Sequence, residues 1–246
     1  MTAPLFLVDP AALEGLGVDD VVDLTGPEAH HAATVVRIGV GEEVLVADRH
    51  GARVLTTAED VSGDLVRLRV VGRVDEPEPS LRLTLVQALS KDGRDEDAVE
   101  AATELGVDRV IPWQADRSIV RWRGPKADKG LRKWANVIER AAKQSRRGRW
   151  PQLSPMVTTS GLALECPGRT PFVLHEDATT PLAGIDLPTE GEVLLVVGPE
   201  GGISPQEVDR LVAVGATPVR LGPQVLRAST AGPAAIAVLS AMGRWR

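Results

Sequence analysis

The pattern of hydrophobic and polar positions changes about one third of the way along the chain. In the first third, apolar residues come in short runs, and residues 64–71 alternate between polar and apolar side chains as a half-buried strand does. Residues 43–48 and 52–57 flank Arg49-His50-Gly51, a hairpin signal with glycine at a left-handed position. Residues 28–38 favour a short helix closed by a glycine. Strands so closely spaced predict a small β-barrel.

The segment 75–80, DEPEPS, interrupts this pattern. Two prolines and three acids in six residues exclude a strand interior and a helix. We therefore predict a barrel domain over residues 1–74, a linker over 75–80 and a second domain over 81–246.

Beyond the linker, apolar runs alternate with helical patterns. Ser204-Pro205-Gln206-Glu207 is a capping box with proline in the first turn, a strong helix start. Nearly continuous apolar strands between helices indicate a buried, mostly parallel sheet, and so an α/β fold. The predicted strands cover residues 81–90, 109–113, 172–175, 193–197 and 218–221, and the predicted helices 95–105, 129–146, 205–215 and 231–242.

Two of the predicted strands run directly into Gly/Pro-rich loops, at residues 196–204 and 220–230. Open α/β sheets bind ligands at the carboxyl ends of their strands, and glycine lets a backbone approach a ligand closely. Neither loop contains G-x-G-x-x-G or a Gly-Lys-[Ser/Thr] phosphate loop. The loops therefore predict a ligand site of another kind. The alternative is that they are ordinary tight connections between a strand and a helix, which have the same glycine and proline content.

Charge is concentrated in one segment of an otherwise acidic chain. The net charge is −6, yet the basic segment, residues 121–149, holds eleven Lys and Arg against Asp128 and Glu139, a charge of +9 against −15 elsewhere. Such a surface is typical of proteins that neutralise phosphates. Four tryptophans in or beside it suit base stacking, although core packing explains at least two of them. A merely solvated helix face remains the alternative.

Composition excludes several other classes of protein. No run of 18 apolar residues predicts a membrane span, and the N-terminus lacks the features of a secretory signal, so we expect a cytoplasmic protein. The single cysteine, Cys166, rules out an internal disulfide, and four histidines make a metal centre improbable. The absence of tyrosine excludes a phenolic general base.

Glu200 and Arg227 are the candidate reactive residues of the two Gly/Pro-rich loops. A carboxylate at the end of a strand, as at Glu200, contacts backbone amides, a ribose or a base edge. Arg227 lies between Val225-Leu226 and a helix of small residues. Its guanidinium either caps carbonyls or pairs with an acid, or it binds a phosphate or a base.

Several short motifs occur along the chain in an order that is specific to one family. The chain resembles the RsmE family of bacterial 16S ribosomal RNA uridine-N3 methyltransferases, members of the SPOUT class. The resemblance covers nearly the whole sequence. It is carried by Glu28-Ala29-His30-His31 with Val36-Arg37, Gln87-Ala88-Leu89-Ser90-Lys91, Ala102-Thr103-Glu104-Leu105-Gly106-Val107, Arg117-Ser118, Ala141-Ala142-Lys143-Gln144-Ser145 with Arg147, and the two C-terminal loops.

The resemblance implies an N-terminal PUA-like β-barrel for RNA recognition and a C-terminal SPOUT α/β domain with a deep trefoil knot. It also implies S-adenosyl-L-methionine as cofactor, 16S rRNA of the small ribosomal subunit as partner, and a homodimer. No metal and no membrane are expected. Two alternatives stay open: a SPOUT enzyme acting on another rRNA or tRNA position, and an RNA-binding relative without catalysis.

The resemblance also assigns residues. The predicted cofactor-binding residues are Leu174, His175, Gly198, Glu200, Gly201, Gly202, Leu221, Gly222, Val225 and Leu226. The predicted RNA-binding residues are His31, Arg37, Arg117, Lys143, Arg146, Arg147 and Arg149. The hypothesised catalytic residues are Arg227, stabilising negative charge on the uracil, and Glu200, accepting the N3 proton. Where many relatives carry a glutamate after a Leu-Arg-Thr pattern, this chain has Leu226-Arg227-Ala228-Ser229-Thr230, so no acid acts there.

Overall fold

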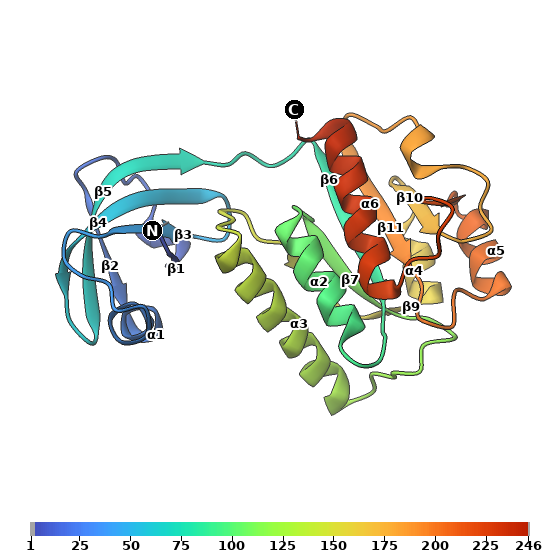
Figure 1. Cartoon of the computed structure of the whole chain (residues 1–246), viewed down its shortest axis with the longest axis horizontal. Helices are drawn as coiled ribbons and strands as arrows, with labels where there is room; N and C mark the ends of the chain where they lie inside the picture. Colours follow the sequence, from blue (N-terminus) through green and yellow to red (C-terminus); the bar gives the residue numbers. More distant parts are fainter. Residues whose placement is uncertain (1–2, 246) are drawn as a thin grey trace. The chain divides into compact units, whose positions relative to one another are not determined.

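The computed structural model describes residues 3–245 and divides the chain into two compact units (Figure 1). The first unit comprises the chain up to Glu78 together with Ala142–Trp150. The second unit comprises Pro79–Ala141 and the chain from Pro151 onward. The change of unit after Glu78 falls within the segment 75–80. Residues 142–150, which were predicted to belong to the second domain, group instead with the first unit.

The first unit is built on a five-stranded sheet in the order β1-β3-β4-β5-β2. Its neighbours pair antiparallel except β1, which runs parallel to β3. Alternate side chains such as Leu24, Val44 and Leu68 form its buried core. The strands are β1 (Leu5–Leu7), β2 (Val21–Thr25), β3 (Glu43–Ala47), β4 (Ala52–Val61) and β5 (Leu65–Asp75).

The helix predicted over residues 28–38 is formed in two parts. The α-helix α1 (Gly26–His30) continues into a π-helical segment, η2 (His31–Val36), which ends at Arg37 in the left-handed conformation with φ of 61°. A left-handed non-glycine residue ends a helix as glycine usually does. His31 and Arg37 are both exposed on this segment.

The second unit is built on a wholly parallel sheet in the order β12-β10-β11-β6-β7-β8, with β9 pairing with β7. This confirms the sheet that the apolar runs predicted. The strands are β6 (Leu81–Ala88), β7 (Arg109–Gln114), β8 (Gln152–Leu153), β9 (Val157–Thr158), β10 (Thr170–Leu174), β11 (Gly191–Val197) and β12 (Thr217–Val219).

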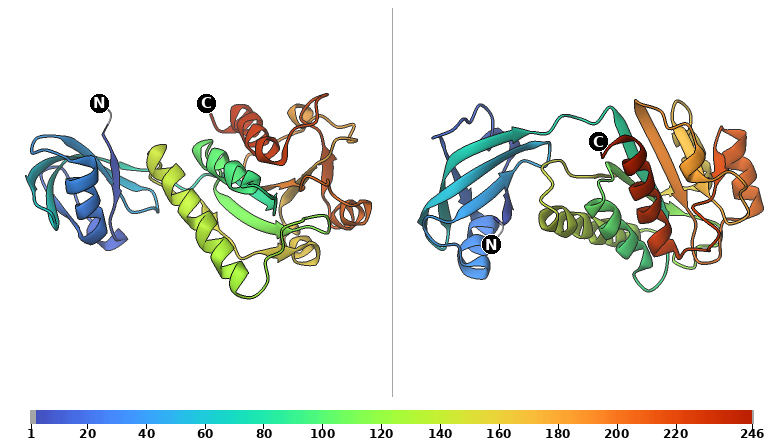
Figure 2. Two further views of the ribbon diagram at one scale, coloured as in Figure 1. Left: turned by 60° about the horizontal axis from the view of Figure 1, so that its bottom comes forward. Right: turned by 45° about the horizontal axis from the view of Figure 1, so that its top comes forward.

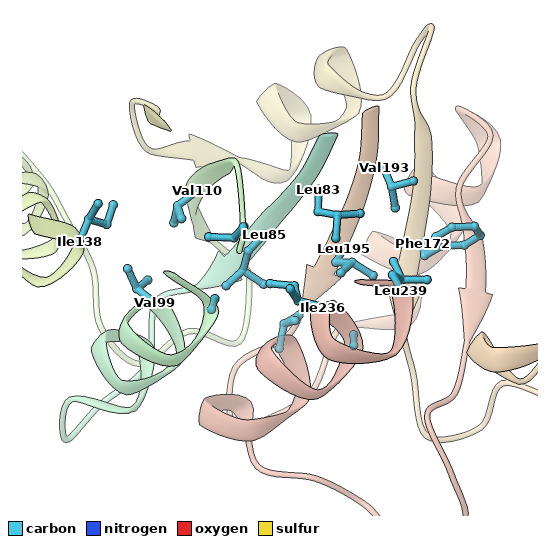
Figure 3. Close-up of a cluster of buried hydrophobic side chains, with 14 of the residues drawn as sticks. Leu83, Leu85, Val99, Val110, Ile138, Phe172, Val193, Leu195, Ile236 and Leu239 are labelled. Carbon is cyan, nitrogen blue, oxygen red and sulfur yellow. The ribbon is translucent and has the colours of Figure 1, made fainter. Parts of the chain in front are cut away.

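Helices cover both faces of this parallel sheet (Figure 2). On one face, Leu83 and Leu85 of β6 share a core with Val99 of α2, Ile138 of α3 and Ile236 of α6 (Figure 3). On the other face, a second cluster joins the sheet to α4 and α5. The helices are α2 (Arg94–Glu104), α3 (Pro125–Gln144), α4 (Thr159–Glu165), α5 (Pro205–Ala213) and α6 (Ala228–Gly243).

The capping box predicted at the start of α5 is present. The Ser204 hydroxyl accepts the Glu207 N–H at 3.3 Å, and the Glu207 carboxylate accepts the Ser204 N–H at 3.1 Å. Two donors at the start of the helix are thereby satisfied. The same carboxylate accepts the Asp116 N–H at 2.9 Å, so the cap also fixes the chain after β7.

The chain that follows β12 is hydrogen-bonded to the loop that follows β10. The Arg220 N–H donates to the Thr180 carbonyl at 2.9 Å, and the Leu182 N–H donates to the Arg220 carbonyl at 2.8 Å. These bonds extend the sheet by one bridge, between Pro181 and Arg220. The two segments therefore lie side by side in parallel at this point.

Helix α3 begins earlier than the sequence predicted, at Pro125 rather than about Lys129. Proline suits the first turn of a helix because no partner is lost there. Gly130, a poor helix former, lies under the indole ring of Trp122, which the Cβ of any other residue would overlap. Trp122 in turn packs edge-on against Trp134, with ring centroids 5.5 Å apart.

Within residues 3–245, no helix is long and apolar enough to cross a membrane. The same part of the chain contains no group of three or more His, Cys, Asp or Glu side chains able to hold a metal ion.

Candidate active site

Two adjoining cavities lie in the second unit, at the carboxyl ends of its parallel strands. The larger measures about 570 Å³ and the smaller about 110 Å³. Both are lined by Leu174, the last residue of β10, by His175, which follows it, and by Val225 and Leu226, which follow β12. The carboxyl edge of a parallel sheet brings these loops together although they are distant in the sequence.

All ten predicted cofactor-binding residues line one or both of these cavities. Leu221 and Gly222 lie on the smaller cavity alone. The other eight line the larger cavity: Leu174, His175, Gly198, Glu200, Gly201, Gly202, Val225 and Leu226. The loops chosen from the sequence therefore converge on one place, and their role there stays a prediction.

The loop after β11 owes its shape to its glycines. A Cβ on Gly198 would lie 2.6 Å from Cγ1 of Ile203, and a Cβ on Gly201 would lie 3.3 Å from Cβ of Arg117. Gly202 has a φ of 72°, a conformation that side chains disfavour. Larger residues at 198 would push the loop outward, so the glycines set the wall of the larger cavity.

Glu200 is tied to the start of α2. Its Oε1 accepts the Lys91 N–H at 3.1 Å and lies 3.5 Å from the guanidinium of Arg94. The sequence suggested that Glu200 contacts backbone amides, a ribose or a base edge, and the structure shows a contact with a backbone amide. Its role as a proton acceptor stays a hypothesis.

Arg227 lies on the larger cavity together with Arg94 and Arg117. It precedes α6 as the N-cap residue, but its side chain makes no capping hydrogen bond. Arg117 donates to the Gly201 carbonyl at 3.0 Å, so this predicted RNA-binding residue lies against the loop after β11. Three arginines thus line one cavity.

Arg94 was not among the predicted site residues. It is the first residue of α2, where the helix dipole disfavours a cation. Asp95, Glu96 and Asp97 follow it, as expected for the first turn of a helix, and the arginine before them is the exception. This exception in the sequence indicated that the positive charge of Arg94 serves a purpose other than helix stability. The structure shows that use in its contact with Glu200.

Asp95 is a buried carboxylate beneath the same turn. It is 4% exposed and accepts the N–H groups of Ser90 and Glu96, at 3.2 and 3.0 Å. Burial raises the pKa of Asp95 from its ordinary 3.8 to about 6, and the negative charge of Glu96 adds to this effect. Asp95 thereby holds the turn that positions Lys91 and Arg94 against Glu200.

This burial predicts a pH-dependent difference in stability between the protein and Asp95→Asn. Because the folded state binds the Asp95 proton more tightly than the unfolded state, folding loses stability as the pH rises from about 4 through about 6. The loss is on the order of 3 kcal/mol, and the variant does not undergo it. Urea unfolding at several pH values is expected to show that the free energy of unfolding of the variant rises relative to that of the parent protein across this pH range. Parallel pH curves would contradict the assignment.

Arg117 belongs to the second unit, and the other predicted RNA-binding residues belong to the first. Lys143 pairs with Glu28 at 2.6 Å. The Arg149 guanidinium donates to the Glu76 carbonyl at 2.9 Å and lies 3.6 Å from the Glu78 carboxylate. These charges are engaged within the first unit. The remaining four are His31 and Arg37 on the helical segment, and Arg146 and Arg147 in the turn after α3.

Comparison with known families matches both parts of the chain. A family model described as an RNA methyltransferase domain matches residues 76–240. A second, described as an RNA methyltransferase PUA domain, matches residues 24–71. These matches confirm the predicted fold class, a PUA-like N-terminal domain followed by a SPOUT α/β domain.

Curated relatives and solved structures agree with the family models. The ribosomal RNA small subunit methyltransferase E of Mycobacterium bovis is 42% identical over 251 residues, covering 100% of this chain and 94% of the relative. The protein of that name from Bacillus subtilis is 29% identical, covering 88% of each chain. That from Neisseria gonorrhoeae, solved bound to S-adenosyl methionine, superimposes with a TM-score of 0.85 at 26% identity, covering 98% of each chain. The chain belongs to the ribosomal RNA small subunit methyltransferase E family of RNA methyltransferases.

Proposed function

We propose that the protein transfers the methyl group of S-adenosylmethionine to N3 of a uridine in 16S rRNA of the small ribosomal subunit. One observation carries the proposal: the loops after β10, β11 and β12 converge on a single site in a member of this family. The solved relatives from Neisseria gonorrhoeae and Legionella pneumophila were crystallised with S-adenosylmethionine.

The residues of the site suit this cofactor. The larger cavity offers apolar surface from Leu174, Val197 and Leu226 for an adenine ring. Arg94 and Arg117 supply positive charge suited to the carboxylate of the methionine part of the cofactor. The loop glycines bring the backbone close to the cavity. When bound, the sulfonium supplies an electrophilic methyl group for in-line displacement. The protein contributes by positioning donor and acceptor.

The acceptor has to lose a proton from N3. We assign Arg227 to stabilise the negative charge that develops on the uracil oxygens, because its side chain has no capping role and lines the larger cavity. Glu200, which accepts the Lys91 N–H and lies 3.5 Å from the Arg94 guanidinium, lines the same cavity, and we assign it as the proton acceptor. Since N3 lies on the Watson–Crick edge, the target uridine is unpaired or flipped out of its helix.

We further propose that the active form is a homodimer in the cytoplasm, where small ribosomal subunits are assembled. Val225 and Leu226 support this proposal. They are 75% and 38% exposed in the single chain, beside the cavities, and a second subunit would cover them. Size-exclusion chromatography with light scattering tests it, with a mass twice the 26.1 kDa of the chain expected.

The activity is tested by methyl transfer from labelled S-adenosylmethionine to small subunits that lack the modification, followed by nucleoside analysis. N3-methyluridine is the expected product. Another methylated nucleoside would move the target to a different position. Binding of RNA without any transfer would identify a non-catalytic relative. The Arg210→Ala variant, altered on α5 away from both cavities, serves as the matched control.

A further inference from the structure

One face of α3 is a continuous basic surface. Its members recur at spacings of three, four and seven residues, so they align along one side of the helix. All are exposed. We call this the basic face of α3: Lys126, Lys129, Arg132, Lys133 and Arg140.

The opposite face of α3 is apolar and packed. Ala127, Leu131, Trp134, Ile138 and Ala141 follow the complementary spacing, and Trp134 and Ile138 are buried in the core of the second unit. This packing fixes the rotation of the helix and holds the basic face outward. From Lys126 to Arg140 it extends about 21 Å along the helix axis.

The charges on this face are largely unneutralised, in contrast to those that follow it. Lys143 and Arg149 of the same basic segment pair with acids of the first unit. On the basic face, Lys133 pairs with Glu96 of α2. Among residues 3–245, no carboxylate lies within 4.0 Å of the charged nitrogens of the other four.

We propose that the basic face of α3 binds the phosphate backbone of the substrate RNA, and this proposal rests on the proposed function. A docking face for a protein normally has an apolar centre within a polar rim. No large hydrophobic side chain of α3 is exposed within the described chain. Charged side chains held in a row on a rigid helix suit an extended polyanion and carry no base specificity. The face therefore contributes affinity and orientation rather than choice of nucleotide.

The test is the salt dependence of RNA binding by the variant Lys126→Gln/Lys129→Gln/Arg140→Gln. Binding of labelled small-subunit rRNA is measured on filters from 50 to 300 mM KCl. Each phosphate contact contributes about 0.7 to the slope of log K against log[salt]. The variant is expected to lose about 2 from that slope, and up to about 100-fold in affinity near 0.1 M salt. Affinity for S-adenosylmethionine is expected to stay at the parent level.

Two further variants make the outcome decisive. Lys126→Arg/Lys129→Arg/Arg140→Lys keeps the three charges and is expected to retain the parent slope. Arg210→Gln removes one exposed charge from α5, on the other face of the sheet, and is expected to do the same. Equal salt slopes for the parent and the triple glutamine variant would overturn the proposal. The basic face would then be either a solvated surface or a binding site for an acidic protein.

Failure of the proposed function would look different. A parent protein that binds rRNA with a steep salt slope but transfers no methyl group overturns the activity and leaves the basic face standing. A triple glutamine variant that methylates subunits with parent KM and parent salt slope overturns the basic face and leaves the activity standing.

Discussion

Replacing Arg227 with alanine is expected to lower kcat for methyl transfer by about 100- to 1,000-fold, the usual cost of losing one donor to a developing anion. The effect follows from its place on the larger cavity without a partner role in the helix cap. Because no side-chain cap is removed, the substitution should leave α6 and the fold intact. Affinity for S-adenosylmethionine should change little, since the charge acts on the acceptor.

Single-turnover methyl transfer to unmodified small subunits, with cofactor binding measured calorimetrically, separates these two effects. The Arg227→Lys variant keeps the charge without the planar fork and is expected to fall between the parent and the alanine variant. Arg210→Ala is the control for loss of an exposed arginine. Unchanged turnover in Arg227→Ala would remove Arg227 from the mechanism. Loss of cofactor affinity equal to the loss of turnover would reassign it to binding.

Replacing Trp134 with alanine is expected to lower the free energy of unfolding by about 3 to 5 kcal/mol. Trp134 is fully buried, lies edge-on to Trp122 and joins α3 to the core of the second unit. Its removal leaves a large cavity and ends the aromatic contact. A milder loss is expected for Trp134→Phe, which keeps an aromatic ring at the site.

Urea unfolding followed by far-ultraviolet circular dichroism measures this difference without relying on tryptophan fluorescence. Asn136→Ala, two residues away on the exposed side of α3, is the matched control and should change stability by less than about 0.5 kcal/mol. A loss below about 1 kcal/mol in Trp134→Ala would show that α3 is held by other contacts.

The second unit was largely predictable because its elements carry strong local signals. The apolar runs of β6 and β11 are buried on both faces, and the capping box marks the start of α5. Elements with weak signals were missed. Strand β1 is three residues long and pairs in parallel with β3, so no hairpin turn in the sequence indicates its presence. Helix α4 has only seven residues, too few for a helical period to emerge.

The cofactor loops were identifiable because glycine and proline mark them in the sequence. The contacts that arrange the site were not, because they join residues about 100 positions apart. The carboxylate of Glu200 meets the Lys91 N–H across 109 residues, and no local pattern encodes that pairing. The same limit applies to Lys143, whose partner Glu28 lies 115 residues earlier in the chain. Charge density alone could not separate these engaged residues from the exposed ones on α3.

The sheet order has a consequence for the synthesis of this protein. Its central strand β6 pairs with β11, more than 100 residues later, and the cavities are closed only by residues after β12. Such distant pairings fold slowly, because a long loop must close before any contact forms. A nascent chain that ends before Leu221 therefore lacks one wall of both cavities. The enzyme can gain its methyl donor only after translation of almost the entire message.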